Sequence, residues 1–124
     1  MTQILVVDDS SVIRKVARRI LDSMNLDTLD VDNAQDALEL CAKSMPDAIL
    51  LDWNMPVMDG YAFLKVLRRM PGGHRPKVML CTTENDAAHI ARAMNAGANH
   101  VLMKPFDKAI LQSKLEDIGI SAAL

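Results

Sequence analysis

The sequence predicts an α/β protein with a doubly wound architecture, in which helices cover both faces of a five-stranded parallel sheet. Within 124 residues, five short apolar runs alternate with five segments of helical periodicity. Four of the runs are mostly apolar instead of alternating between apolar and polar residues, as is typical of strands that are covered on both faces. Because a helix follows each strand, the strands are expected to run parallel and to be joined by right-handed crossovers. The length predicts one domain over residues 1–124.

The predicted strands are the short apolar runs themselves. They cover Ile4 to Val7, Leu26 to Val31, Ala48 to Leu51, Lys77 to Cys81 and His100 to Met103. The second run is interrupted by Asp27, Thr28 and Asp30, so it is expected at an edge of the sheet, where fewer residues are buried.

The segments between the strands repeat their apolar residues at helical spacing, which predicts one apolar face on each helix. In the first helix this face comprises Val12, Ile13, Val16, Ala17, Ile20, Leu21 and Met24. The later helices are predicted over Ala34 to Ser44, Tyr61 to Met70, Ala87 to Ala96 and Ala109 to Ile118, with Asn33, Asp59, Asn85 and Asp107 as N-caps. Gly97 suits the left-handed residue that ends the fourth helix.

Composition and charge argue against several classes of function. The formal net charge is −2 and the isoelectric point is about 5.8, whereas nucleic-acid-binding domains are usually strongly basic. No stretch approaches the roughly 20 apolar residues that cross a bilayer, and no charged leader precedes an apolar run. We therefore expect a soluble, cytoplasmic protein with neither nucleic-acid nor membrane partners. Cys41 and Cys81 lack C-x-x-C spacing and are predicted to be buried thiols in a reducing compartment.

Polar residues follow four of the predicted strands at the point where each strand ends. They are Asp8 and Asp9 after the first strand, Asp52 after the third, Thr82 after the fourth and Lys104 after the fifth. Ligands of such folds bind at the carboxyl ends of the strands, where the connection direction reverses. The sequence therefore predicts that these five side chains converge on one edge of the sheet.

Three carboxylates brought close together repel one another, and a divalent cation between them offsets that cost. Mg²⁺ prefers oxygen ligands and commonly joins carboxylates to a phosphate, so a phosphoryl group is the expected second partner. Asp52 would act as the nucleophile, Lys104 would supply a positive charge and Thr82 a hydroxyl donor. The structural alternatives are helix-capping acids at Asp8 and Asp9, and a turn acid at Asp52.

These residues stand in motifs that resemble the response regulator receiver family over nearly the whole chain. The motifs are Val6-Val7-Asp8-Asp9-Ser10, Asp52-Trp53-Asn54-Met55-Pro56 with Met58-Asp59-Gly60, Thr82, and Lys104-Pro105-Phe106. The resemblance implies a flavodoxin-like (βα)5 fold with strand order 2-1-3-4-5. It also implies a two-component switch that is not an enzyme in the usual sense, although it promotes its own phosphorylation and dephosphorylation.

The resemblance further implies roles for individual residues. Asp52 would accept a phosphoryl group from a histidine kinase or a histidine phosphotransfer protein. Asp9, Asp52 and the backbone carbonyl of Asn54 would ligate Mg²⁺, with Asp8 acting partly through water. The peptide bond between Lys104 and Pro105 would be cis, which the reduced trans preference before proline permits.

Within the family, the chain is most similar to the stand-alone chemotaxis regulators of the CheY type. Asn54 and Glu84 flank the site in positions that influence how fast water reaches the acyl phosphate, and together they imply a short-lived signal. Thr83 is bulkier than the small residue usual at its position and is expected to slow that turnover. Val101 stands where the family often has a switching aromatic, so the way in which the output is transmitted is left open.

Two basic segments have no place in this chemistry. Arg14, Lys15, Arg18 and Arg19 are predicted on the exposed side of the first helix, either as a contact for an acidic partner or as a solvated face. Five basic residues surround Pro71-Gly72-Gly73 without P-loop spacing and are interpreted as a flexible basic turn. They are Arg68, Arg69, His74, Arg75 and Lys77.

Three functional hypotheses remain open at this level. In the first, phosphorylation shifts the surface of the fourth helix, fifth strand and fifth helix toward partner binding, in a monomer or a phosphorylation-dependent dimer. In the second, the domain is a phosphate sink or relay element. The third is a phosphatase of the haloacid-dehalogenase type, which would need a general acid where Asn54 stands. Because the chain ends at Leu124, any response is expected to pass through a separate, unknown target protein.

Overall fold

The structure is a computed structural model and describes residues 2–123. Its strands are β1 (Gln3–Val7), β2 (Asp27–Val31), β3 (Ala48–Asp52), β4 (Lys77–Thr82) and β5 (His100–Met103). Its helices are α1 (Ser11–Ser23), α2 (Ala34–Lys43), α3 (Gly60–Arg69), α4 (Ala87–Ala96) and α5 (Lys108–Asp117). Strand and helix alternate along the described chain as the sequence predicts.

The five strands form one parallel sheet in the order β2-β1-β3-β4-β5. Both the predicted order and the position of β2 at an edge are confirmed. The chain leaves β1 in one direction to reach β2, and from β2 it crosses back to β3 on the other side of β1. The direction of winding therefore reverses between β1 and β3, which is the place where doubly wound folds bind ligands.

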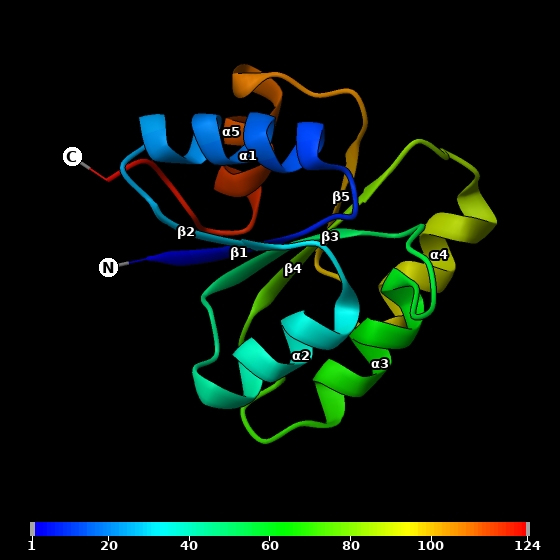
Figure 1. Cartoon of the computed structure of the whole chain (residues 1–124). Helices are drawn as coiled ribbons and strands as arrows, with labels where there is room; N and C mark the ends of the chain where they lie inside the picture. Colours follow the sequence, from blue (N-terminus) through cyan, green and yellow to red (C-terminus); the bar gives the residue numbers. More distant parts are fainter. Residues whose placement is uncertain (1, 124) are drawn as a thin grey trace.

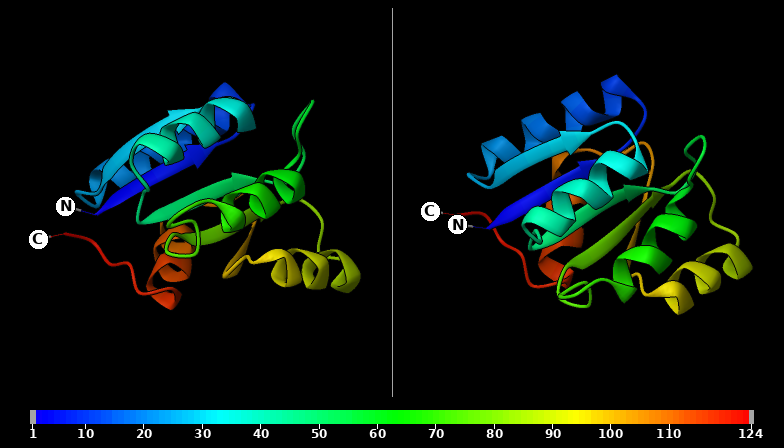
Figure 2. Two further views of the ribbon diagram at one scale, coloured as in Figure 1. Left: turned by 90° about the horizontal axis from the view of Figure 1, so that it is seen from below. Right: turned by 60° about the horizontal axis from the view of Figure 1, so that its bottom comes forward.

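Helices cover the sheet on both sides and produce two separate hydrophobic cores (Figure 1). Helices α1 and α5 lie on one face, over a core that includes Ile4, Leu50 and Leu102. Helices α2, α3 and α4 lie on the other face, where Phe63 and Leu80 are fully buried. The views of Figure 2 show α3 and α4 side by side at the end of this second layer. Burial on both faces explains the apolar runs of the central strands.

Helix boundaries follow the capping residues, with one correction. The side chains of Asn33, Asp59 and Asp107 accept hydrogen bonds from the backbone of the helices that they precede, as predicted. At α4 the predicted cap Asn85 is wrong. The carboxylate of Asp86 accepts the bond from Ala88 N at 3.0 Å, because Asp86 is the residue that directly precedes the first turn.

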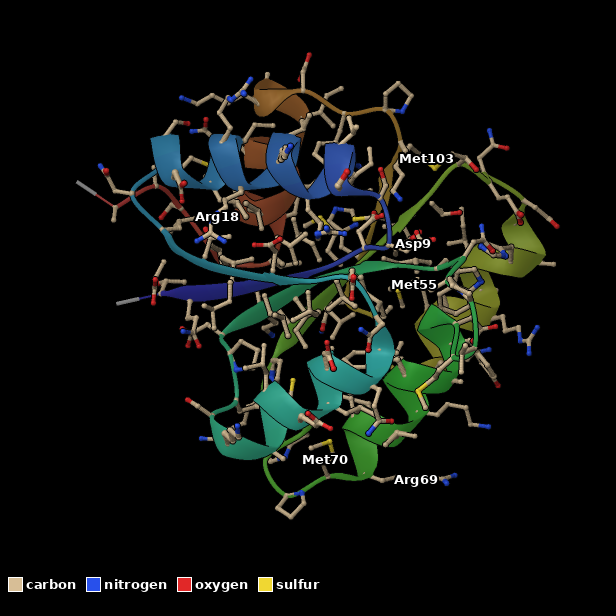
Figure 3. The ribbon with its side chains drawn as sticks, viewed as in Figure 1. Asp9, Arg18, Met55, Arg69, Met70 and Met103 are labelled. Atoms are coloured by element: carbon tan, nitrogen blue, oxygen red, sulfur yellow. The ribbon has the colours of Figure 1, made fainter. Side chains whose placement is uncertain are left out.

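The basic side chains of α1 are not all exposed, contrary to the prediction. Arg14 has a side chain that is 19% exposed, and its Nε lies 3.1 Å from the Asp30 carboxylate. Arg18 pairs with the same carboxylate, and Figure 3 shows its side chain on the sheet side of α1. Asp30, one of the acidic residues that mark β2 as an edge strand, thus pairs with α1, and Arg18 stays exposed together with Lys15 and Arg19.

The basic residues around Pro71-Gly72-Gly73 do not all belong to a flexible turn either, because Arg68 lies at the end of α3. Arg68 donates hydrogen bonds to the carbonyl oxygens of Gly73, Pro76 and Gly97, and so joins the end of α3 to the following turn and to the end of α4. Gly97 adopts the predicted left-handed conformation, with φ of 115°. Arg68 is therefore a structural residue.

Two further features bear on the sequence predictions. Cys41 and Cys81 are free and buried, as predicted, and burial raises the pKa of their thiols to about 11 and about 12. Among residues 2–123, no helix has the length and apolar character needed to cross a membrane.

Candidate functional site

The register of the sheet brings the predicted site residues to one edge. Val7 of β1 pairs with Leu51 of β3, so the residues that follow them, Asp8 and Asp52, lie at the same level. On the other side of β3, Asp52 pairs with Cys81, and Thr82 comes next. Figure 3 shows Asp9, Met55 and Met103 close to this edge, each at or just beyond the end of a different strand. The predicted convergence is therefore a direct result of parallel pairing.

Three carboxylates form the centre of this edge. Asp8, Asp9 and Asp52 each offer an oxygen atom, and these oxygens lie within 4.8 Å of one another. Asp8 is 2% exposed and Asp52 is 6% exposed, whereas Asp9 is exposed to solvent. Ser10 N donates to Asp8 Oδ1 at 2.9 Å, which orients that carboxylate. Two buried acids and one exposed acid thus share a small volume that opens to solvent.

Lys104 supplies the positive charge of the site. Its Nζ lies 2.7 Å from Asp8 Oδ2 and 3.1 Å from Asp52 Oδ1. The peptide bond between Lys104 and Pro105 is cis, as the family resemblance implies. Burial by itself would lower the pKa of Lys104, but the hydrogen bond and charge of Asp8, together with Asp52, outweigh it and raise that pKa. The ammonium group is therefore held in its charged form between two acids.

Asp52 is the perturbed acid of the cluster. Burial and then the charge of Asp8 raise the pKa of its carboxyl, Lys104 lowers it, and the net result is a rise from 3.8 to about 6. One ammonium group does not fully balance three neighbouring carboxylates. The pocket is consequently short of positive charge at neutral pH.

Thr82 lies at the end of β4 with its side chain buried. Its Oγ1 accepts a hydrogen bond from Glu84 N at 3.0 Å and so orders the segment that leads into α4. Lys104 N donates to the Thr82 carbonyl at 2.9 Å, which links the ends of β4 and β5. Thr83 and Glu84 are both exposed at the mouth of the site.

The loop after Asp52 leaves one backbone carbonyl without a hydrogen-bond partner among the described residues. Asn54 is exposed, and its N–H donates to Asp52 Oδ1 at 3.3 Å. Within residues 2–123 no hydrogen bond occupies the Asn54 carbonyl. Val57 stands in the same loop with φ of 69° and its side chain in solvent. A β-branched residue rarely adopts this conformation, so the loop holds local strain beside the acids.

The cluster suits a magnesium ion in its donor chemistry. Carboxylate and carbonyl oxygens are the ligands that Mg²⁺ prefers, and the acids already lack the positive charge that a divalent ion supplies. Exposure on one side leaves room for the water ligands that Mg²⁺ usually keeps. Asp8, Asp9, Asp52 and the Asn54 carbonyl are the groups that would hold it.

A comparison with known protein families identifies the chain. The family model described as response regulator receiver domain matches residues 4–116. This chain belongs to the response regulator receiver domain family. This match confirms the resemblance drawn from the motifs. The observed flavodoxin-like (βα)5 fold is the one that the resemblance implies.

Individual relatives agree with this assignment. The receiver domain is 34% identical over 118 residues to a chemotaxis protein CheY homologue of Campylobacter jejuni, covering 94% of this chain and 91% of that protein. Among solved structures it is similar to the chemotaxis response regulator CheY4 of Vibrio cholerae, with a TM-score of 0.91 and 30% identity over 95% of this chain and 98% of the other.

A second solved structure bears on the metal site. The receiver domain of the sensor histidine kinase PA1611 from Pseudomonas aeruginosa has a TM-score of 0.86 and 30% identity, covering 94% of this chain and 95% of that chain. That structure has a magnesium ion coordinated in its active-site cleft. Receiver domains are phospho-accepting switches of two-component systems that interact with histidine kinases and downstream targets.

The structure adds an aromatic cluster that the sequence analysis missed. The Trp53 ring makes edge contacts with Tyr61 of α3 and His89 of α4, with centroids 5.7 Å and 5.3 Å away. His89 Nδ1 lies 3.3 Å from a Glu84 carboxylate oxygen, and its Nε2 is buried with no partner among the described residues. Nothing in the spacing of these residues indicates the cluster, because three separate loops and helices bring them together.

Proposed function

We propose that this receiver domain takes a phosphoryl group onto Asp52, with Mg²⁺ held by Asp9, Asp52 and the Asn54 carbonyl, and with Asp8 acting partly through water. One observation supports this most strongly. A buried carboxylate with a raised pKa lies between Lys104 and two further acids at the point where the sheet reverses its winding.

The transfer needs a nucleophile and charge compensation. A carboxylate oxygen of Asp52 attacks the phosphorus of a phosphohistidine, a P–O bond forms as the P–N bond breaks, and the imidazole of the donor leaves. The Lys104 ammonium group stabilises the negative charge of the transferred oxygens, and the Thr82 hydroxyl, which accepts from Glu84 N, uses its own proton to donate to one of them. When bound, Mg²⁺ supplies the Lewis acidity that neutralises charge on the same oxygens.

Loss of the signal is a hydrolysis of the acyl phosphate. Water attacks the phosphorus, the Asp52 carboxylate leaves, and inorganic phosphate is released. Asn54, Thr83 and Glu84 are exposed around the site and control how water approaches. The bulk of Thr83 is proposed to slow this step, and the domain thereby sets the lifetime of its own signal.

Phosphorylation would then act as a two-state switch. The added charge draws Thr82 and Lys104 inward and shifts the population of the surface formed by α4, β5 and α5. Val101 is half-buried and packs against the core of the α2–α4 side, so this position of β5 offers no aromatic ring to carry the change. The names of the CheY-type relatives support a chemotaxis output, with a histidine kinase or phosphotransfer protein as donor.

The other two hypotheses have less support. Asn54 stands where a haloacid-dehalogenase-type phosphatase needs a general acid, and an amide cannot exchange the proton. A phosphate sink or relay element would share all the chemistry of the switch. It differs in one measurable way, because partner affinity would not change on phosphorylation.

The decisive experiment is phosphorylation by a small donor. Wild-type protein and Asp52→Asn are incubated with Mg²⁺ and acetyl phosphate, and intact mass is followed over time. The wild type is expected to gain one labile phosphoryl group and the variant none. Omission of Mg²⁺ serves as a control and should prevent the gain. If both proteins are modified equally, Asp52 is not the acceptor.

A further inference from the structure

A basic groove of about 660 Å³ lies between α3 and α4, away from the acidic cluster. Tyr61, Lys65 and Arg69 line it from α3, and Arg92 lines it from α4. No acidic residue is among its lining residues. Lys65, Arg69 and Arg92 are exposed, and none of them forms an ion pair within residues 2–123. The groove is thus a local positive surface on a chain whose net charge is −2.

The cations are arranged around one aromatic ring. The Arg92 guanidinium carbon lies 4.1 Å from the centroid of the Tyr61 ring, and Lys65 Nζ lies 5.2 Å from it. A hydrogen bond from Arg92, and then the charge of Lys65, lower the pKa of the Tyr61 hydroxyl, which agrees with a positive potential in the groove. These contacts hold the two charges close to the groove.

The α4 wall is made of small residues. Ala88 and Ala91 are exposed to the groove, and Asn95 continues the row one turn later. Small side chains allow the backbone of another helix to approach closely. On the opposite wall, Lys65 and Arg69 stand four residues apart on one face of α3 (Figure 3 shows Arg69 directed away from the molecule).

We propose that the groove between α3 and α4 binds an acidic α-helix of a partner protein. Carboxylates four residues apart on that helix would meet Lys65 and Arg69, and a third would meet Arg92, while the helix backbone lies against the alanines of α4. A nucleic acid fits less well, because its binding needs a basic surface far broader than one groove. A nucleotide fits less well because cations already lie over the Tyr61 ring on which its base would stack.

The groove is connected to the acidic site through α3. A Cβ atom at Gly60 would lie 2.6 Å from the Asp52 carbonyl oxygen and 2.9 Å from Trp53 Cα, so α3 begins in direct contact with that peptide. Tyr61, the next residue, contacts the Trp53 ring. If Asp52 is phosphorylated as proposed above, a displacement of the Asp52–Trp53 peptide would be transmitted through α3 to the groove. The docking proposal itself does not depend on that step.

The test uses a defined probe and the full chain. The probe is an alanine-based helical peptide with glutamates four residues apart, and its control is the same peptide with glutamine in their place. Amide chemical shifts of the ¹⁵N-labelled, unphosphorylated protein are followed during titration. We expect shifts in residues 61–69 and 88–96 with the glutamate peptide, absence of binding by the glutamine peptide, and weaker binding as NaCl rises from about 50 mM to about 0.5 M.

Charge variants locate the site. Lys65→Glu/Arg69→Glu/Arg92→Glu is expected to weaken binding at least about tenfold, and the milder triple glutamine variant to weaken it in the same direction. The matched control Lys15→Glu/Lys43→Glu/Lys108→Glu makes the same change in net charge at exposed positions outside the groove and should bind within about twofold of the wild type.

Several results would overturn the proposal. These are shifts confined to another surface, equal binding by the groove variant, and a site that inorganic triphosphate fills while the glutamate peptide does not bind. Salt-dependent self-association of the unliganded protein that the groove variant abolishes would instead assign the groove to a second copy of the chain. Because acetyl phosphate labelling is measured separately, failure here is distinguishable from failure of Asp52 phosphorylation.

Discussion

At the scale of single residues, the site depends on an imbalance of charge around Asp52. Asp8, Asp9 and Asp52 each place an oxygen within 4.8 Å of the other two. Among residues 2–123, Lys104 is the cation that forms ion pairs with two of them. Such a cluster costs folding free energy when all of its members are ionised, and a divalent ion or a change of residue relieves that cost. The function proposed for the site and its local instability therefore have the same physical origin.

We expect Asp52→Asn to stabilise the metal-free protein at neutral pH. The folded-state pKa of Asp52 is about 6, above the ordinary value of 3.8, so the folded protein binds the proton more tightly than the unfolded chain. Its contribution to stability is fully present below pH about 4 and is lost as the pH rises through about 6. At pH 7 in EDTA, the free energy of unfolding of the variant should exceed that of the wild type by about 1 to 3 kcal/mol, as measured by urea denaturation.

The pH series provides the control for this effect. At pH about 4 the wild type and the variant should have nearly equal stabilities, because the Asp52 carboxyl is then mostly protonated in the folded state. A stability difference that is independent of pH would mean that packing, not ionisation, distinguishes the two proteins.

At the scale of elements, close contacts hold α3 and α4 in position relative to the site. Gly60 allows α3 to begin directly against the Asp52–Trp53 peptide, and Arg68 ties the other end of α3 to the end of α4. Between these two points, Trp53 contacts Tyr61 and His89. The two helices that border the basic groove are thus attached to the residue next to the proposed phosphoacceptor.

Gly60→Ala tests the first of these contacts. An alanine Cβ would be 2.6 Å from the Asp52 carbonyl oxygen, which is backbone that cannot move without moving β3. Alanine favours a helix by about 1 kcal/mol over glycine, so the steric cost must exceed that gain. We expect a net loss of about 1 to 3 kcal/mol in the free energy of unfolding. A neutral or stabilising result would show that α3 shifts freely at its start.

Arg68→Lys tests the second contact. Lysine cannot reproduce the planar set of bonds to the carbonyls of Gly73, Pro76 and Gly97, so about 1 to 3 kcal/mol of stability should be lost. Arg69→Lys is the matched control, because the Arg69 side chain is exposed and forms no hydrogen bond within residues 2–123, and it should change stability by less than about 0.5 kcal/mol. Thermal and urea unfolding of the two variants measures the difference.

At the scale of the whole molecule, ion binding and folding are coupled, because strands β1 and β3 must pair before the acids meet. The acids come from segments more than forty residues apart in the chain, so the unfolded protein has no comparable site. Any ion that binds the folded site alone therefore stabilises the entire domain.

We expect Mg²⁺ to raise the free energy of unfolding of the wild type. The gain should reach about 2.7 kcal/mol when the free ion is at about 100 times its dissociation constant. Removal of the ion with EDTA should reverse the gain. Asp9→Asn deletes one proposed ligand at an exposed position and should reduce the gain at every concentration. Equal stabilisation of wild type and variant would exclude Asp9 as a ligand.

Much of this protein was determined by the sequence alone. The apolar runs identify the central strands, because strands buried on both faces carry mostly apolar residues, and the polar residues of the second run mark β2 as an edge strand. The acids at the strand ends locate the site. Local signals also placed the caps at Asn33, Asp59 and Asp107, since a cap needs only its own helix. The N-cap of α4 was wrongly assigned to Asn85, because Asn85 and Asp86 are adjacent and both residue types cap helices. The residue at which α4 begins decides between them.

Only the tertiary structure decided the features that join distant segments. Arg14 was expected in solvent, but β2 brings Asp30 to it and to the exposed Arg18. Arg68 was expected in a turn, but carbonyl oxygens of Gly73, Pro76 and Gly97 surround it. The Trp53, Tyr61 and His89 cluster and the basic groove likewise arise where α3 packs beside α4. Periodicity in a sequence tells which face of an element is buried, whereas the pairing of two elements depends on packing across the whole domain, which no local pattern contains.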